Sequence, residues 1–298
     1  MEKFNTQGRF FRRFRALCLI VVMLLAAGCS SMRLAYNQGD TLLYWWLNAY
    51  LDLDADQGEW VRQDIDRIFQ WHRKSQLKDY AQLLATGQRQ LAGNLTEAEL
   101  MADYREIKAR TDVLALKAVP ELAELAHSVR PEQIAKMEKK FRSKNEDYRD
   151  KFLSGDTEKR QKQRFKKSMQ QLELWFGNFS SAQEAVLRKV SDARPLNNEI
   201  WYEERLLRQK KIVALLRKVQ QEKLGKEQTA ALVEQLVKDI LGRFDAPERK
   251  AFFDASIGGT IQMILTAVRI ATPEQKAHAQ RRMQGWIDDF KELAAEPQ

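Results

Sequence analysis

Cysteine is nearly absent from this sequence, because Cys18 and Cys29 are the only two among 298 residues. Both lie near the N-terminus, so the later part of the chain has no thiol. This absence excludes a disulfide framework, a thiolate metal site and a cysteine nucleophile from everything after residue 29. The fold must therefore be stable through its hydrophobic core alone.

Glycine and proline are also scarce, with 13 and 6 occurrences. Residues with high helix propensity dominate instead. Apolar residues recur at helical spacing, as at Leu232, Val233, Leu236 and Val237, and few stretches alternate with a period of two. Phosphate-binding glycine loops, Rossmann fingerprints and serine nucleophile elbows are missing. The sequence predicts an all-α protein with no recognisable catalytic motif and no cofactor.

An apolar run long enough to span a membrane is missing from the N-terminal region. The run from Ala16 to Ala27 has only twelve residues, whereas a spanning helix needs roughly 20. Five basic residues precede it, and small residues follow it. This order is typical of a secretory signal peptide, which we assign to residues 1–28.

The end of that run, Ala26-Ala27-Gly28-Cys29, resembles the lipobox of bacterial lipoproteins. The resemblance implies that Cys29 receives a diacylglyceryl group, that the chain is cleaved before it, and that the new amine is acylated, for example with palmitate. Ala26 stands where leucine is usual. Ser30 follows the cysteine in place of aspartate, which by the same resemblance implies transfer to the outer membrane, with the domain on its periplasmic face.

The basic character of the chain comes largely from the signal peptide. Residues 1–28 hold five basic residues and one acidic residue, so without them the formal charge falls from +9 to +5. The net charge of the remaining chain therefore does not support nucleic-acid binding. We expect the membrane, through Cys29, to be the main partner, with envelope proteins, unfolded chains or lipopolysaccharide as further candidates.

A capping pattern recurs along the chain and marks helix starts. A cap residue is followed three positions later by Gln or Glu, as in Asp54 with Gln57 and Thr96 with Glu99. Similar starts occur at Arg130, Ser180, Gly225, Asp245 and Thr272. After a short tether at 29–40, residues 41–298 should form one helical domain, either an antiparallel bundle or an irregular helical array. The expected helices are 54–91, 96–128 with a bend at Pro120, 131–152, 157–176, 180–193, 196–223, 226–242, 246–270 and 273–293.

Two family resemblances follow from these motifs. The run LAYNQGDTLLYWWLNAYLDLDADQ (34–57) after a lipobox is similar to an uncharacterised family of proteobacterial lipoproteins, and this resemblance implies no activity. LTEAE (95–99) and TPEQ (272–275) resemble the Leu-Thr-x-x-Gln signature of small periplasmic helical chaperones of the Spy and CpxP type. That signature consists largely of the helix-capping pattern described above.

Candidate metal ligands are few. Asp52, Asp54 and Asp56 alternate like the start of a calcium loop, but the required glycine and final acid are each one residue out of register. A helix cap is the preferred interpretation. The three histidines have no partner at metal spacing, and His72 lies on an apolar stripe, which favours a packed side chain. We therefore predict no metal site.

Two surfaces are candidates for contact with partners. Trp45 and Trp46 lie close to the expected lipid anchor, where aromatic residues favour the membrane interface, but burial against the bundle is the favoured interpretation. KRQKQRFKK (159–167) is the densest basic stretch. It is either a solvated helix face or an acceptor for anionic partners. Its candidate contact residues are Lys159, Arg160, Lys162, Arg164, Lys166 and Lys167.

Three functions remain open from the sequence. The first is a non-enzymatic binding or chaperone-like protein of the envelope, and it is preferred because no catalytic motif is found. The second is a peptidoglycan-directed hydrolase that uses Glu or Asp. The third is a purely structural adaptor. Paired acids in a cleft favour the hydrolase, whereas a wide groove with basic and apolar patches favours binding.

Overall fold

The fold is all-α, as predicted. The computed structural model describes residues 31–296, and within them it contains thirteen α-helices, a π-helical turn, a 3₁₀ turn and no strand. The connections are short. The elements are α2 (Ser31–Asn37), α3 (Gly39–Leu51), α4 (Ala55–Ser75), α5 (Leu77–Ala92), α6 (Glu97–Lys117), α7 (Val119–Ser128), α8 (Pro131–Tyr148), η2 (Arg149–Leu153), α9 (Thr157–Phe176), α10 (Ser181–Asp192), α11 (Asn198–Gln221), α12 (Lys226–Leu241), η3 (Gly242–Asp245), α13 (Pro247–Ile270) and α14 (Pro273–Ala295).

Most predicted helix starts are confirmed by their caps. The carboxylate of Asp54 accepts a hydrogen bond from the Gln57 backbone N–H at 2.8 Å, and the Gln57 side chain bonds back to the cap. Thr96, Ser180 and Thr272 cap α6, α10 and α14 in the same way. The prediction for Asp245 is wrong, because this residue lies in η3 and α13 begins at Pro247 without a side-chain cap.

Two long predicted helices are each divided. The expected helix 54–91 breaks at Gln76, where the Ser75 hydroxyl donates to the Trp71 carbonyl at 2.7 Å, a contact that bends helices. The expected helix 96–128 ends at Lys117, and α7 starts at Val119. Pro120 explains this second break, because its ring lacks an N–H and clashes with the carbonyl four residues before it.

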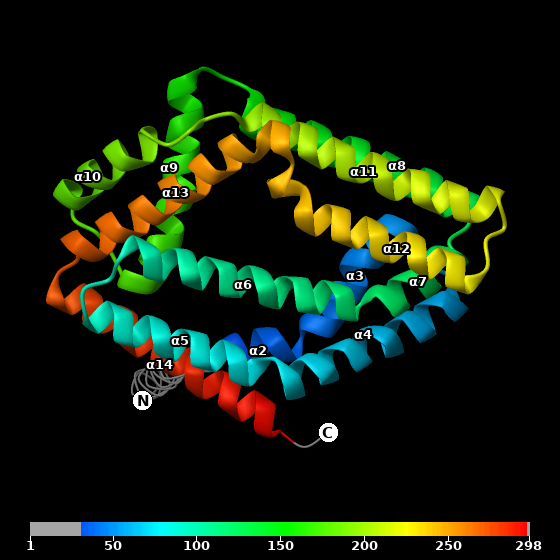
Figure 1. Cartoon of the computed structure of the whole chain (residues 1–298), viewed down its shortest axis with the longest axis horizontal. Helices are drawn as coiled ribbons and strands as arrows, with labels where there is room; N and C mark the ends of the chain where they lie inside the picture. Colours follow the sequence, from blue (N-terminus) through cyan, green and yellow to red (C-terminus); the bar gives the residue numbers. More distant parts are fainter. Residues whose placement is uncertain (1–30, 297–298) are drawn as a thin grey trace, which may run out of the picture.

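Two apolar cores lie at opposite ends of the molecule (Figure 1). One is built by α3, α4, α7, α8, α11 and α12, and the other by α5, α9, α10, α13 and α14. Helix α6 runs between the two groups and contacts α12 and α13. No residue of α6 is buried. The chain is thus an irregular helical array of two cores, with a partly exposed helix between them.

Two glutamines join the starts of α4 and α8. Gln57 and Gln133 are the third residues of their helices, and their side chains are 5% and 2% exposed. The Gln133 amide donates to Gln57 Oε1 at 2.7 Å and to the Asp52 carbonyl at 3.2 Å. The Gln57 amide donates to the Ser128 carbonyl at 2.9 Å. Each glutamine therefore closes its own capping box and also binds the segment that precedes the partner helix.

The same arrangement recurs in the other core, between α10 and α14. The Gln183 amide donates to Gln275 Oε1 and to the Ile270 carbonyl, both at 2.8 Å. The Gln275 amide donates to the Asn178 carbonyl at 2.7 Å. The carbonyls that are used lie two residues before the caps in all four cases. We call these two arrangements the paired glutamine caps.

Part of the expected tether is helical. Helix α2 covers residues 31–37 and packs against α14, where Arg33 forms an ion pair with Glu292. Tyr36 on α2 contacts Phe69, with ring centroids 5.7 Å apart. The segment that follows the expected anchor is therefore fixed to the helical domain from residue 31 onward.

Helix α13 is long and apolar enough to cross a membrane by length and composition alone, with a mean hydropathy of 1.4 over its most apolar 18 residues. It packs against α10 and α6, and it contributes Phe253, Met263 and Ala267 to the buried residues. Core helices of soluble proteins also reach this hydropathy. Met263 and Ala267 belong to the second core, so α13 is part of that core.

Candidate functional site

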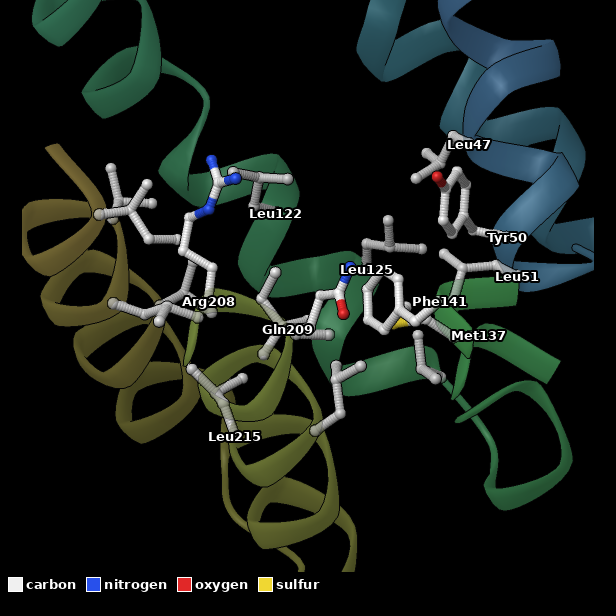
Figure 2. A pocket seen from close by; sticks show the side chains of 18 of the residues that line it. Leu47, Tyr50, Leu51, Leu122, Leu125, Met137, Phe141, Arg208, Gln209 and Leu215 are labelled. Atoms are coloured by element: carbon white, nitrogen blue, oxygen red, sulfur yellow. The ribbon is translucent and has the colours of Figure 1, made fainter. Parts of the chain in front are cut away.

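The first candidate site is an apolar cavity of about 440 Å³ between α3, α7, α8, α11 and α12. Figure 2 shows aliphatic and aromatic side chains from these helices around it, with Arg208 and Gln209 extending from α11. Its volume lies within the range typical of ligand cavities, roughly 300–1,000 Å³. The lining residues are Trp46, Leu47, Tyr50, Leu51, Leu122, Leu125, Ala126, Val129, Met137, Phe141, Arg205, Arg208, Gln209, Ile212, Leu215, Leu216, Val233, Leu236, Val237 and Ile240.

The wide apolar stripes of α11 and α12 produce this cavity. Val213, Leu216 and Val233 are buried in the first core, whereas Ile212 and Val237 are only partly covered. The stripes are therefore wider than the contact between the two helices. The uncovered part of each stripe faces the space toward α3 and α7, where it forms the wall of the cavity.

A basic edge borders the cavity on α11. Arg205 and Arg208 are three residues apart and so lie on the same face of the helix. Arg205 donates through Nε to Asn145 Oδ1 at 2.7 Å. Burial lowers the pKa of the Arg208 guanidinium below its usual value, and the neighbouring Arg205 lowers it further. Arg243 is close by, because Arg208 contributes to lowering the pKa of its guanidinium as well.

A second apolar cavity of about 570 Å³ lies between α3, α4, α6 and α7, with Tyr36 from α2. The two cavities share Trp46, Leu47, Leu122 and Leu125 as lining residues. Leu122 is 40% exposed and Trp46 is 58% exposed, whereas Leu125 is buried and Leu47 is partly buried. The two cavities therefore meet along one apolar strip that is open to solvent at Trp46 and Leu122, and we refer to the pair as the groove.

The second cavity also contains polar groups. The Tyr36 hydroxyl is 2.8 Å from His72 Nδ1, and burial raises the pKa of Tyr36 to about 12. Burial lowers the pKa of His72, which lies between the rings of Tyr36 and Tyr80. His72 is therefore a packed histidine, as the sequence predicted. Within residues 31–296, no group of three or more His, Cys, Asp or Glu side chains could hold a metal ion.

Two carboxylates line this second cavity. Burial raises the pKa of Asp64 above its usual value; the ion pair with Arg67 opposes this, and Glu121 adds to it. Glu121 Oε2 is buried without a hydrogen-bond partner. Asp64 and Glu121 are therefore the acids that the hydrolase alternative would use.

The predicted interface tryptophans are both exposed. Trp45 is 59% exposed and Trp46 is 58% exposed, and Leu42 on the same helix and Leu34 on α2 exceed 60%. Tyr44, in contrast, is buried in the first core. Trp46 has a second role, because it lines both cavities of the groove. The favoured prediction, burial against the bundle, is therefore wrong for both tryptophans.

The basic stretch 159–167 divides into two kinds of residue. Lys159, Lys162, Lys166 and Lys167 are exposed on α9. Arg160 pairs with Glu199 at 2.7 Å. Arg164 donates to the carbonyls of Ser191 and Pro195 at 2.7 and 2.8 Å. Arg160 thus holds the start of α11, and Arg164 holds the end of α10 and the loop after it. The four lysines are the part of the stretch available to an anionic partner.

Cys29, the predicted lipidation site, lies outside the residues that the structure describes. Asp54 has the predicted capping role and also pairs with Arg130, while Asp52 pairs with Lys136 at 2.6 Å. Sequence reasoning did not find the groove or its basic edge. The sequence feature that could have indicated the basic edge is Arg208, which lies within one turn of Ile212 on the apolar stripe of α11. Such arginines are also common on solvated helix faces.

The site and the fold together define a helical protein with an open apolar groove and a basic edge. Residues 49–236 match a family of unknown function, DUF6279, and the chain belongs to that family. The matched region runs from the end of α3 into α12 and so includes most of the groove. No curated protein and no solved structure matches the chain. Membership of an uncharacterised family is thereby confirmed, and the comparisons assign no activity.

Proposed function

We propose that this protein is an envelope lipoprotein that binds apolar molecules or apolar chain segments in the groove, without catalysing a reaction. The observation that carries the proposal is the apolar strip of Trp46, Leu47, Leu122 and Leu125, which is exposed at Trp46 and Leu122 and joins two cavities of about 440 and 570 Å³. A contiguous apolar surface of this kind is a typical binding feature of a protein in water.

The position of the groove supports a function close to a membrane. Trp46 belongs to α3, and α3 follows α2, the first described helix after the proposed anchor at Cys29. Leu34, Leu42 and Trp45 form an exposed apolar face on these two helices. Acylation of Cys29 would hold this face and the adjoining groove near the lipid surface of the outer membrane, on its periplasmic side.

We expect the substitution Val237→Trp to block the groove, because the larger ring fills space at the partly covered stripe of α12. The probe is dodecanol bearing a diazirine, added to membrane vesicles that contain the full chain. Photolabelling of peptide 212–217, which holds Ile212 and Leu215, should fall about fivefold or more. The reason is that even one or two methylenes of the probe that are no longer buried reduce its affinity by about this factor. Mass spectrometry of tryptic peptides measures the labelling.

The matched control is Val186→Trp, which makes the same change at an exposed position on α10 that lines neither cavity. Labelling of peptide 212–217 should be unchanged in this variant. Equal labelling in the parent and both variants, or labelling spread evenly over the exposed helices, would contradict the proposed binding function.

The anchor is tested separately. Replacing Cys29 by Ser removes the thiol that would accept the diacylglyceryl group. We expect the parent to incorporate labelled palmitate and the Cys29→Ser variant to incorporate none, because the modification needs a sulfur nucleophile. Incorporation by the variant, followed on gels of immunoprecipitated protein, would refute lipidation at this residue.

The alternative of an envelope hydrolase rests on Asp64 and Glu121 in the second cavity. Burial raises the pKa of Asp64, as expected for a general acid. However, Arg67 pairs with the Asp64 carboxylate, and the cavity walls around it are mainly apolar. A sugar substrate would need many more hydrogen-bonding groups there, so binding of apolar molecules is the preferred function. A purely structural adaptor would not require the groove.

A further inference from the structure

Two arginines, Arg205 and Arg208, line the α11 edge of the first cavity. Arg243 of η3 does not line the cavity, but the charge of Arg208 acts on its guanidinium. Within residues 31–296, none of these three guanidiniums forms an ion pair. Glu204 raises the pKa of Arg208 and Arg243, but its carboxylate is also bound to Arg249. This edge therefore has a local excess of positive charge that Glu204 offsets only in part.

The charge at this edge is costly for the folded protein. Arg208 is only partly exposed, and its guanidinium remains protonated in proteins. Two like-charged neighbours and partial burial both disfavour a charged group, which an anion bound in the cavity would offset. Arg208 makes no hydrogen bond with the described residues, so no polar contact within the fold accounts for an arginine at this position. In Figure 2 its guanidinium extends from α11 toward Leu122 on α7, at the strip shared by both cavities.

Gln209, one of the uncharged polar side chains of the lining, is already satisfied. It accepts a hydrogen bond from Asn145 Nδ2 at 2.7 Å and donates to Asn145 Oδ1 at 3.1 Å. The other uncharged polar groups of the lining are the Tyr50 hydroxyl and the Trp46 indole N–H. The charged groups are the guanidiniums of Arg205 and Arg208, and the other lining residues are apolar.

We propose that the first cavity binds a single-chain anionic lipid, with the alkyl chain among the residues of α11 and α12 and a phosphate head group on Arg208 and Arg205. A guanidinium matches phosphate oxygens with two parallel hydrogen bonds, and it is less strongly hydrated than an ammonium group. The alkyl chain provides the apolar complement to Ile212, Leu215 and Val237. The proposal rests on the binding function of the groove, and it adds the chemical class of the ligand.

The test uses the full chain in membrane vesicles and three diazirine probes with the same twelve-carbon chain. Their head groups are phosphate, hydroxyl and trimethylammonium. Labelling of peptide 212–217 is measured against probe concentration in the parent, Arg208→Gln and Lys210→Gln. Lys210 is the matched control, because it is an exposed cation on the same helix that does not line the cavity. Comparing variants with the same probe cancels differences in partitioning into the vesicles.

We expect Arg208→Gln to raise the concentration of the phosphate probe needed for half-maximal labelling about tenfold, because a charge-assisted contact is lost. The alcohol probe should change less than about twofold, and Lys210→Gln should affect neither probe. Arg208→Lys keeps the charge and should lie between Arg208→Gln and the parent. Circular dichroism checks that Arg208→Gln keeps the native fold. If this variant is misfolded, Arg205→Gln serves as the second variant.

Several results would overturn the proposal. Equal losses for the phosphate and alcohol probes in Arg208→Gln would show that the arginine does not bind the head group. If the trimethylammonium probe labels peptide 212–217 as efficiently as the phosphate probe does, the arginines do not select a negatively charged head group. Competition by an acidic unfolded polypeptide but not by dodecyl phosphate would assign the groove to protein segments. If no probe, the alcohol included, labels peptide 212–217 in the parent protein, the proposed binding function itself is contradicted.

Discussion

Replacing Gln133 by Leu is expected to lower the free energy of unfolding by about 2–4 kcal/mol, since several buried polar groups then lose their partner. The Gln133 side chain accepts from the Arg130 backbone N–H at 2.9 Å and donates to the Asp52 carbonyl and to Gln57. Leucine has similar size but offers no hydrogen bond. Chemical denaturation followed by circular dichroism measures the change.

The double variant Gln57→Leu with Gln133→Leu should cost less than the sum of the two single variants by about 1 kcal/mol or more, because the two amides are partners in one network. The matched control is Gln228→Leu. Gln228 bonds only to the Gly225 backbone N–H at 3.3 Å at the start of α12, and its side chain is exposed. We expect a cost there of less than about 1 kcal/mol. Strictly additive costs, or a control as destabilised as Gln133→Leu, would show that pairing adds nothing to capping.

Replacing Arg164 by Gln should destabilise the domain by about 2–4 kcal/mol. Its guanidinium donates to the carbonyls of Ser191, Arg194 and Pro195 at 2.7, 3.2 and 2.8 Å. Ser191 lies in the last turn of α10, where a positive charge is favourable. The variant loses hydrogen bonds from a charged, half-buried donor, and the carbonyls of Arg194 and Pro195 lose this partner. Thermal and chemical unfolding of the variant measure the effect.

Lys166→Gln is the control for that experiment, because Lys166 is exposed on the same helix and belongs to the same basic stretch. It should change stability by less than about 0.5 kcal/mol. If both variants behave like the parent, Arg164 is no more than part of a solvated face. Any test of the stretch as a contact for anionic partners should therefore change only the four lysines.

The sequence predicted the helices well because their starts have local chemical causes. A cap such as Asp54 and an amide such as Gln57 are only three residues apart, so both are visible in one short segment. The break at Gln76 was missed because Ser75 gives only a weak local sign, and a continuous helix has the same apolar pattern. The cap assigned to Asp245 failed because Pro247 allowed the helix to begin later.

Local patterns do not show which helix starts meet in space. Gln57 and Gln133 have the same role in their own helices as Gln228 has in α12, yet only the first two are paired. The groove was invisible for the same reason. The stripe of α11 predicts that Ile212 faces a core, but whether another helix covers it depends on the placement of α3 and α7. Likewise, composition does not separate the structural Arg164 from the exposed Lys166.

The paired glutamine caps have a consequence for the order in which the chain folds. One pair joins residues 76 positions apart, and the other joins residues 92 positions apart and ends at Gln275. Loop closure over such distances is slow compared with helix formation. If the chain crosses a membrane from its N-terminus, the Gln57–Gln133 pair becomes available while the second half is still being delivered. The core around Gln183 and Gln275 must wait for almost the whole chain, so it is the part exposed longest to the proteases and chaperones of the receiving compartment.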